Sequence, residues 1–274
     1  LFDAYSGVAV PAPQFNEGLL YWIGRLHVDM LAGLPGKLFL GVMGLLFGVA
    51  TVSGVVLYRP FMTKLAFGTV RRERSRRVKW LDLHNLLGIV ATGWLLVVAL
   101  TGVINTLDET LYASWQKNEI ARLTSAWQGK PMPTEFGSIT KAVRAAQAER
   151  PDLRPAFVSY PGTGYSGNHH YGVFMSGTTP LTERNYQPLL FDARTAELSA
   201  VPAWPIAMSA MYLSQPLHYG DYGGLPLKIL WAFFDLVSIA VLAGGLYLWL
   251  GRRGTPLALR VREVSRGGEV EAAA

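Results

Sequence analysis

The sequence predicts a membrane all-α helical bundle, with three transmembrane helices in this chain and a small α+β domain beside them. Three apolar stretches are each long enough to cross a bilayer as a helix of about 20 residues. Only 16% of the residues are charged, against about 25% in an ordinary soluble domain. The chain also has no cysteine, which excludes disulfides, Cys-ligated zinc and iron–sulfur clusters.

Two of the apolar stretches belong to an internal repeat. Shifting the sequence by 191 residues superimposes His27 on His218, and each histidine is followed by Gly-Leu-Pro and a lysine, Lys37 or Lys228. Identities held in register along a whole span indicate duplication. Because each copy carries one histidine at the same membrane depth, we expect His27 and His218 to clamp a haem iron at one membrane face.

Composition divides the chain into seven segments. They are 1–16, the end of a first β-containing element; 17–58, an interfacial helix plus a transmembrane helix; 59–79, a basic loop; 80–107, a transmembrane helix; 108–199, an α+β domain; 200–250, a lead-in plus a transmembrane helix; and 251–274, a tail. The first ten residues, LFDAYSGVAV, resemble LFDARTAELS at 190–199, with a turn and a short strand after Leu-Phe-Asp-Ala. No signal-peptide pattern occurs there, so we expect the chain to begin inside a larger protein.

Charge sets the expected orientation in the membrane. The loop 59–79 carries eight lysines and arginines and one acid, which the positive-inside rule places in the cytoplasm. A nucleic-acid reading of this loop is weak, because membrane proteins carry such loops routinely. Arg252 and Arg253 put the C-terminus in the cytoplasm, and the polar tail 254–274 is expected to be disordered.

The second span, Leu86–Leu107, is opened by Asp82-Leu83-His84-Asn85. Because this span begins at the basic loop, His84 is expected at the cytoplasmic face. Gly88 lies one helical turn further on the same face, where a missing side chain leaves room for a porphyrin.

Residues 108–199 are expected to form the α+β domain on the opposite side. A helix is predicted at Ser138–Arg150 and three antiparallel strands at Pro155–Tyr160, Tyr171–Ser176 and Tyr186–Asp192, with 200–216 leading back along the membrane surface. His169 and His170 fall in a Gly-rich turn, which predicts an exposed loop, with a weak metal or substrate contact as the alternative.

Further polar residues are candidates near the expected sites. Arg25, Lys37 and Lys228 lie near the outer pair of histidines and suit either haem propionates or lipid phosphates. Asp235 is the only acid inside an apolar span, which indicates either a functional group or an acceptor for a neighbouring helix. No flavin or nicotinamide fingerprint occurs, so electrons have to come from another protein or domain.

Three histidine-bearing motifs, RLHVDMLAGLPGK, WLDLHNLLGIVATGWLLVVALTGVINT and PLHYGDYGGLPLKILWAFFD, resemble the PepSY-associated transmembrane family of bacterial inner membranes. Residues 134–198 resemble the periplasmic PepSY domain that accompanies it. The resemblance implies a multi-pass protein with two b-type haems, in which His27 and His218 ligate the periplasmic-side haem and His84 the cytoplasmic-side one. It also implies four transmembrane helices in the full protein, so the partner of His84 is absent from this chain, together with most of a first PepSY domain.

The family includes ferrisiderophore reductases, so the resemblance implies electron transfer from cytoplasm to periplasm through haem b. The expected donor is a cytoplasmic flavoprotein or reduced flavin, and the expected acceptor a ferric siderophore or other ferric complex. Two alternatives stay open: an electron-transfer or accessory subunit of a larger respiratory membrane complex, and a non-enzymatic PepSY module that binds a periplasmic partner. The expected surroundings are the lipid bilayer and a second membrane subunit, without nucleic acid.

Overall fold

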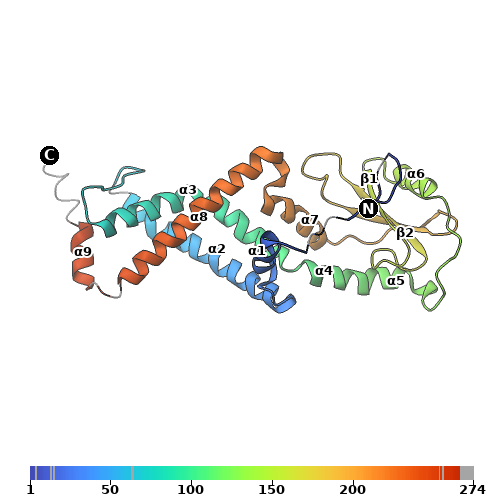
Figure 1. Cartoon of the computed structure of the whole chain (residues 1–274), viewed down its shortest axis with the longest axis horizontal. Coiled ribbons are helices and arrows are strands. Elements are labelled where there is room, and N and C mark those ends of the chain that lie inside the picture. Colours follow the sequence, from blue (N-terminus) through green and yellow to red (C-terminus); the bar gives the residue numbers. More distant parts are fainter. Residues whose placement is uncertain are drawn as a thin grey trace.

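Figure 1 shows an elongated molecule, with long helices crossing at one end and a small sheet at the other. The computed structural model describes residues 1–3, 5–12, 14, 16–62, 65–252, 254 and 256–265, and only the backbone of 59–62 and 263–265. In this described part, three helices are long and apolar enough to cross a membrane: α2 (Leu34–Met62), α3 (Arg76–Asn105) and α8 (Gly224–Arg252). The predicted number of spans is therefore confirmed.

The internal repeat is present in three dimensions. The short helices α1 (Leu19–Asp29) and α7 (Ile206–Tyr219) each carry a histidine in the last turn, and each leads into a 29-residue helix, α2 or α8. Gly33 and Gly224 stand at equivalent places between the paired helices, with φ of 63° and 59°. Glycine adopts a positive φ without steric cost, so each copy has a glycine where its long helix begins.

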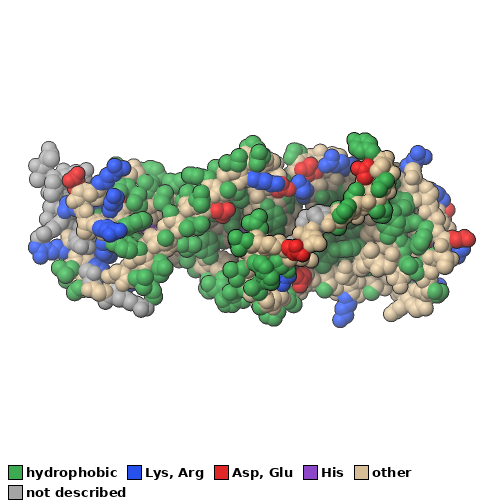
Figure 2. All heavy atoms as spheres, viewed as in Figure 1, with side chains coloured by type: hydrophobic (Ala, Val, Ile, Leu, Met, Phe, Trp, Pro, Cys, Tyr) green, Lys and Arg blue, Asp and Glu red, His purple; other side chains and the backbone are tan. Residues whose placement is uncertain are grey.

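The helix α3 packs against both α2 and α8. A side chain at Gly44 of α2 would place its Cβ 3.2 Å from a methyl group of Val103 on α3. Small residues thus let the two backbones approach, as the GxxxG pattern predicts. On the face shown in Figure 2, apolar side chains cover the crossing helices, whereas lysines and arginines gather at the end that carries α9 (Leu257–Ser265).

The helix α3 begins earlier than predicted, at Arg76, so His84 lies in its third turn instead of at its start. At the far end it runs almost directly into α4 (Asp108–Trp115), the π-helical turn η1 (Gln116–Ile120), α5 (Ala121–Leu123) and the 3-10 turn η2 (Ser125–Trp127). The 48 residues from Arg76 to Leu123 measure about 70 Å at a rise of 1.5 Å per residue, against about 30 Å of bilayer core. The part from α4 onward therefore projects from the membrane and carries the sheet.

The sheet has four antiparallel strands in the order β1 (Arg154–Ser159), β2 (His170–Ser176), β3 (Gln187–Asp192) and β4 (Leu198–Ala200). The predicted helix is α6 (Ile139–Glu149). The expectation of three strands was one short, because β4 is only three residues long.

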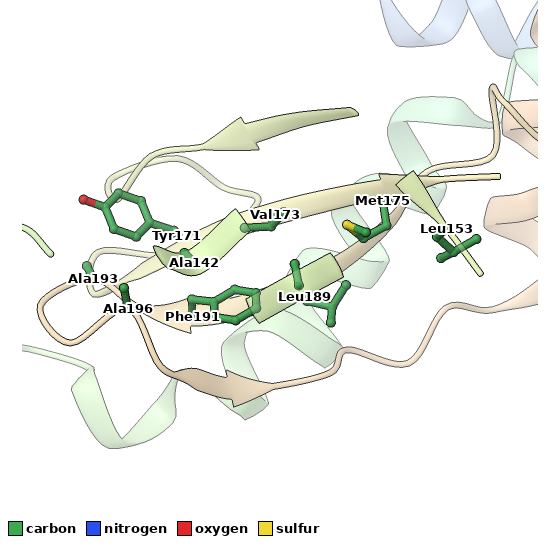
Figure 3. Close-up of a cluster of buried hydrophobic side chains, with 10 residues drawn as sticks. Ala142, Leu153, Tyr171, Val173, Met175, Leu189, Phe191, Ala193 and Ala196 are labelled. Carbon is green, nitrogen blue, oxygen red and sulfur yellow. The ribbon is translucent and has the colours of Figure 1, made fainter. Parts of the chain in front are cut away.

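One face of the sheet packs on α6. Alternate residues of a strand point to the same face, so Tyr171, Val173 and Met175 of β2 meet α6 together with Leu189 and Phe191 of β3. Figure 3 shows these side chains converging on one another. This cluster is the hydrophobic core of the sheet domain.

Asp3 and Asp192, at equivalent places in the two similar segments, make the same kind of turn contact. The carboxylate Oδ1 of Asp3 accepts a hydrogen bond from the backbone N–H of Ser6 at 2.7 Å. The equivalent Asp192 accepts from the N–H of Thr195 at 3.0 Å. The N-terminal segment is thus a second copy of the turn between β3 and β4.

Two segments outside the spans, the lead-in to the last span and the C-terminal tail, are more helical than predicted. The lead-in to the last span forms α7, and a 3-10 turn, η3 (Asp221–Gly223), follows it. The tail that was expected to be disordered forms α9 (Leu257–Ser265), since Leu257 and Val261 recur at helical spacing among arginines. The remaining tail, 266–274, lies outside the described residues, as do Lys64, Arg253 and the side chain of Arg59, which belong to the predicted basic end.

Candidate functional site

The structure brings the two repeat-related histidines together. The ring centroids of His27, on α1, and His218, on α7, lie 6.2 Å apart, and their planes differ by 26°. Both rings line one cavity of about 300 Å³ at the end of the helices nearest the sheet domain. Its other walls come mainly from α2 and α3 and include Leu40, Met43, Gly44, Phe47, Val98, Ala99, Gly102 and Asn105.

Hydrogen bonding fixes the tautomer of His218. Its Nδ1 lies 3.0 Å from the hydroxyl of Thr101, which donates its own proton to the carbonyl of Val97 at 2.6 Å. The hydroxyl is therefore the acceptor and Nδ1–H the donor, which leaves the lone pair on Nε2. Burial lowers the pKa of His218, and nearby His27 lowers it further, against an opposing hydrogen bond to the Val98 carbonyl. The ring is thus kept neutral, the form that ligates metals.

The glycine Gly102 on α3 leaves room for the His218 ring. A Cβ added at Gly102 would lie 3.2 Å from Cε1 of His218. Such a contact is closer than side chains normally make, so glycine is needed for the imidazole to lie against the helix backbone.

A hydrogen bond also fixes the tautomer of His84, toward the other end of α3. Its Nδ1 lies 2.9 Å from the carbonyl oxygen of Val241 on α8. A carbonyl only accepts, so Nδ1 donates and Nε2 carries the lone pair. A Cβ at Gly245 would lie 3.1 Å from Cε1 of His84, so here too a glycine lets the ring rest against a helix.

A second cavity, of about 250 Å³, lies beside His84. Gly88, predicted to leave room there, lines it, and so does Gly54 on α2; a Cβ at either would meet nothing within 4 Å. Among the described residues that line this cavity, His84 is the only histidine. Phe47 lines both cavities, so the two sites are neighbours.

The cations that were predicted to bind anionic groups have partners within the chain. Arg25 pairs with Asp29 at 2.6 Å. Lys37 is buried at the wall of the His27–His218 cavity and pairs with Asp108 at 2.9 Å and Glu109 at 2.6 Å. These last contacts fasten the start of α2 to the start of α4.

The repeat-related Lys228 is also paired. Its ammonium lies 2.5 Å from Asp221, whose other oxygen is 2.7 Å from Arg184 of the sheet domain. Both repeats therefore use the lysine after Gly-Leu-Pro to hold a carboxylate of a neighbouring segment.

Two histidines of the sheet domain differ from each other. The exposed-loop prediction was wrong for His170, which begins β2, is 1% exposed and packs edge-on against Trp127. Its Nε2 lies 3.0 Å from the hydroxyl of Ser199. His169 remains in the turn, where its Nε2 contacts the carbonyl of Lys130 at 3.3 Å. In the part of the chain that the structure describes, no three His, Asp or Glu side chains form a metal-binding group.

Asp235 lies on the exposed side of α8, within electrostatic range of His27. The sequence identified it as an acid in a span. The sequence did not indicate that the Thr101 hydroxyl and the Val241 carbonyl accept hydrogen bonds from the histidines. A hydroxyl or carbonyl inside a helix has no distinctive sequence pattern.

The comparisons with known proteins agree with the arrangement of helices. A family model described as the PepSY-associated TM region matches residues 1–252. An uncharacterized protein of Pseudomonas aeruginosa is 28% identical over 267 residues, and the match covers 88% of this chain. This chain spans 66% of that relative's length, which is just under two thirds. Since the family model covers nearly all of the chain, the protein belongs to the PepSY-associated transmembrane family.

Proposed function

We propose that this protein binds haem b through His27 and His218 and carries electrons across the bacterial inner membrane. The observation that carries the proposal is the 6.2 Å separation of the two imidazole centroids. An imidazole nitrogen binds a metal at about 2.0–2.1 Å, so two imidazoles on opposite sides of one metal have centroids about 6 Å apart. The porphyrin supplies the other iron ligands, so two protein ligands are sufficient.

The surrounding residues suit this group. Thr101 orients His218 and directs its proton away from the cavity, and such outer hydrogen bonds accompany most metal-ligating histidines. The apolar walls from α2 and α3 exclude water from a flat, largely apolar ligand. Haem with two neutral imidazole ligands supplies a one-electron carrier whose iron is closed to other ligands.

His84 is proposed as the ligand of a second haem toward the cytoplasm. Its Nδ1–H is held by the Val241 carbonyl, and Gly54 and Gly88 leave the adjacent space open. Phe47 lines both this space and the first cavity, so the two proposed sites are neighbours. A further side chain that would hold this haem is proposed to come from a segment or subunit beyond the described residues.

The direction of transfer follows from charge. The lysines and arginines at the His84 end support our proposal that this end and the C-terminus face the cytoplasm, and that the sheet domain is a periplasmic PepSY-like domain. We propose reduced flavin or a flavoprotein as donor and a ferric siderophore or other ferric complex as acceptor. One observation favours a second candidate, an electron-transfer subunit of a larger membrane complex: His84 has no histidine partner among the described lining residues.

The test is iron reduction across a sealed membrane. The 274-residue chain, loaded with haem, is reconstituted into liposomes that contain reduced flavin mononucleotide, with a ferric chelate and an impermeant ferrous-iron dye outside. We expect colour to develop with the wild type and with H169A, and to be lost with H218A.

The outcomes separate the candidates. Haem binding without dye reduction would favour the subunit of a larger complex. A wild-type protein that binds no haem and reduces no more dye than empty liposomes would contradict both candidate functions. The protein would then remain a membrane module of its family.

A further inference from the structure

The cavity shared by His27 and His218 contains a buried donor without an acceptor. Asn105 is the last residue of α3 and lines this cavity, and its side-chain Nδ2 is buried without a hydrogen-bond partner. Its Oδ1 faces the hydroxyl of Ser214 on α7, which shares its one proton between this oxygen and the carbonyl of Met211, 2.9 Å away. The amide is therefore anchored through its oxygen, with its amino group unused.

Lys37 and Thr106, which also line this cavity, are already engaged. The ammonium of Lys37 is shared between Asp108 and Glu109, and the hydroxyl of Thr106 donates to the carbonyl of Val103 at 2.8 Å. The predicted cationic partner of a propionate thus has two carboxylates of its own. Buried amide donors nearly always have an acceptor in native proteins, so a ligand is the natural source of one here.

The position of Asn105 indicates which part of a ligand it meets. Val98, Gly102 and Asn105 follow one another at helical spacing on the cavity face of α3. Gly102 lies against the His218 ring, and Asn105 lies about one turn beyond it, toward the sheet domain. A donor at this place faces the outward edge of a group clamped by the two histidines, where a polar substituent avoids the bilayer.

We propose that Asn105 Nδ2 donates a hydrogen bond to a carboxylate of the ligand held by His27 and His218, a haem propionate. This inference rests on the proposed haem site. It assigns to a neutral amide the role that the sequence suggested for Arg25, Lys37 and Lys228. Asn105 is then a binding residue that fixes the rotation of the ligand in its plane.

The test compares haem with haem dimethyl ester, in which both carboxylates are blocked. Purified H84A protein, which keeps only the His27–His218 site, is titrated with each compound, and binding is followed by the visible spectrum. A hydrogen bond to a charged group corresponds to about a 10- to 100-fold preference for haem over the ester. We expect that preference with Asn105 present and its loss in N105L.

Two further variants sharpen the result. N105D places the carboxylate of the new aspartate next to the haem propionate, and the two charges repel. This variant is therefore expected to bind the ester at least as well as haem. N118L changes an exposed asparagine outside the cavity and is expected to keep the wild-type preference. If N105L does not fold, N105S retains a small donor and is expected to keep part of the preference.

The inference is overturned if N105L keeps the full preference, or if N105D binds haem as tightly as the parent protein. Equal binding of haem and ester by the parent also overturns it, while leaving the haem site intact. A parent protein that gives no haem spectrum with either compound instead overturns the proposed function, and this inference with it.

Discussion

The hydroxyl of Thr101 lies 3.0 Å from Nδ1 of His218 and accepts a hydrogen bond from it, because the hydroxyl donates its own proton to the carbonyl of Val97. Replacing Thr101 by valine keeps the shape but removes this acceptor. Loss of such an outer hydrogen bond typically weakens metal binding about 10- to 100-fold. We therefore expect T101V to bind haem more weakly in a spectrophotometric titration, with the Val98 carbonyl retaining part of the orientation. Wild-type affinity in T101V would contradict the role of Thr101.

The open space at Gly88 gives a selective prediction. A leucine there fills part of the 250 Å³ cavity beside His84, while the His27–His218 cavity is unchanged. We expect G88L to lose the haem of the His84 site and to keep the other, measured as haem per chain. The matched control is G93L, on the same helix but not on the cavity wall. Equal haem content in both variants would contradict the assignment of this cavity.

The repeat-related lysines should differ in their effect on stability. Lys37 is 7% exposed and holds two carboxylates, so K37M leaves these without their cation. Because Asp108 and Glu109 are partly exposed, we expect a loss of about 1–3 kcal/mol, less than for a fully buried pair. K228M removes a half-exposed lysine and should cost about 1 kcal/mol or less. Thermal unfolding in detergent compares the two, and an equal fall in Tm would contradict this difference.

Burial of His170 makes the sheet domain sensitive to acid. Burial lowers the pKa of His170 from its usual 6.5, with His169 adding to the effect and Asp192 opposing it. The unfolded chain therefore takes up the proton first, so this contribution to stability is complete above about pH 6.5 and is lost as the pH falls toward the lowered pKa. We expect the Tm of the whole protein to fall between pH 7 and pH 5, and to fall less in H170Q. Identical slopes in both proteins would rule out His170 as the source.

The spans and the repeat could be predicted because they depend on local sequence. An apolar run of sufficient length crosses a bilayer in any context, and the matching Gly-Leu-Pro segments at Gly33 and Gly224 fold alike. The start of α3 was missed because the charged residues from Arg76 to Lys79 read as loop. In the structure they form the first helical turn, capped by the hydroxyl of Ser75.

The parts of the site that depend on contacts between distant segments could not be predicted from the sequence. The pairing of His27 with His218 followed from the duplication, but nothing near Lys37 in the sequence indicates partners 71 and 72 residues away. The same applies to the Val241 carbonyl that orients His84, and to the side-chain Nδ2 of Asn105. These depend on how the helices are rotated about their axes, which hydrophobic length and composition do not specify.

The most direct measurement is the visible spectrum of the purified, haem-reconstituted chain after reduction. We expect a b-type α band that H27A and H218A each diminish, because either change removes one of the two imidazoles proposed to hold the haem. H84A should diminish a separate part of the band, and H169A should leave the spectrum unchanged. A wild-type protein without the band, or a band that survives in H27A and H218A alike, would contradict the haem site and the electron-transfer function that depends on it.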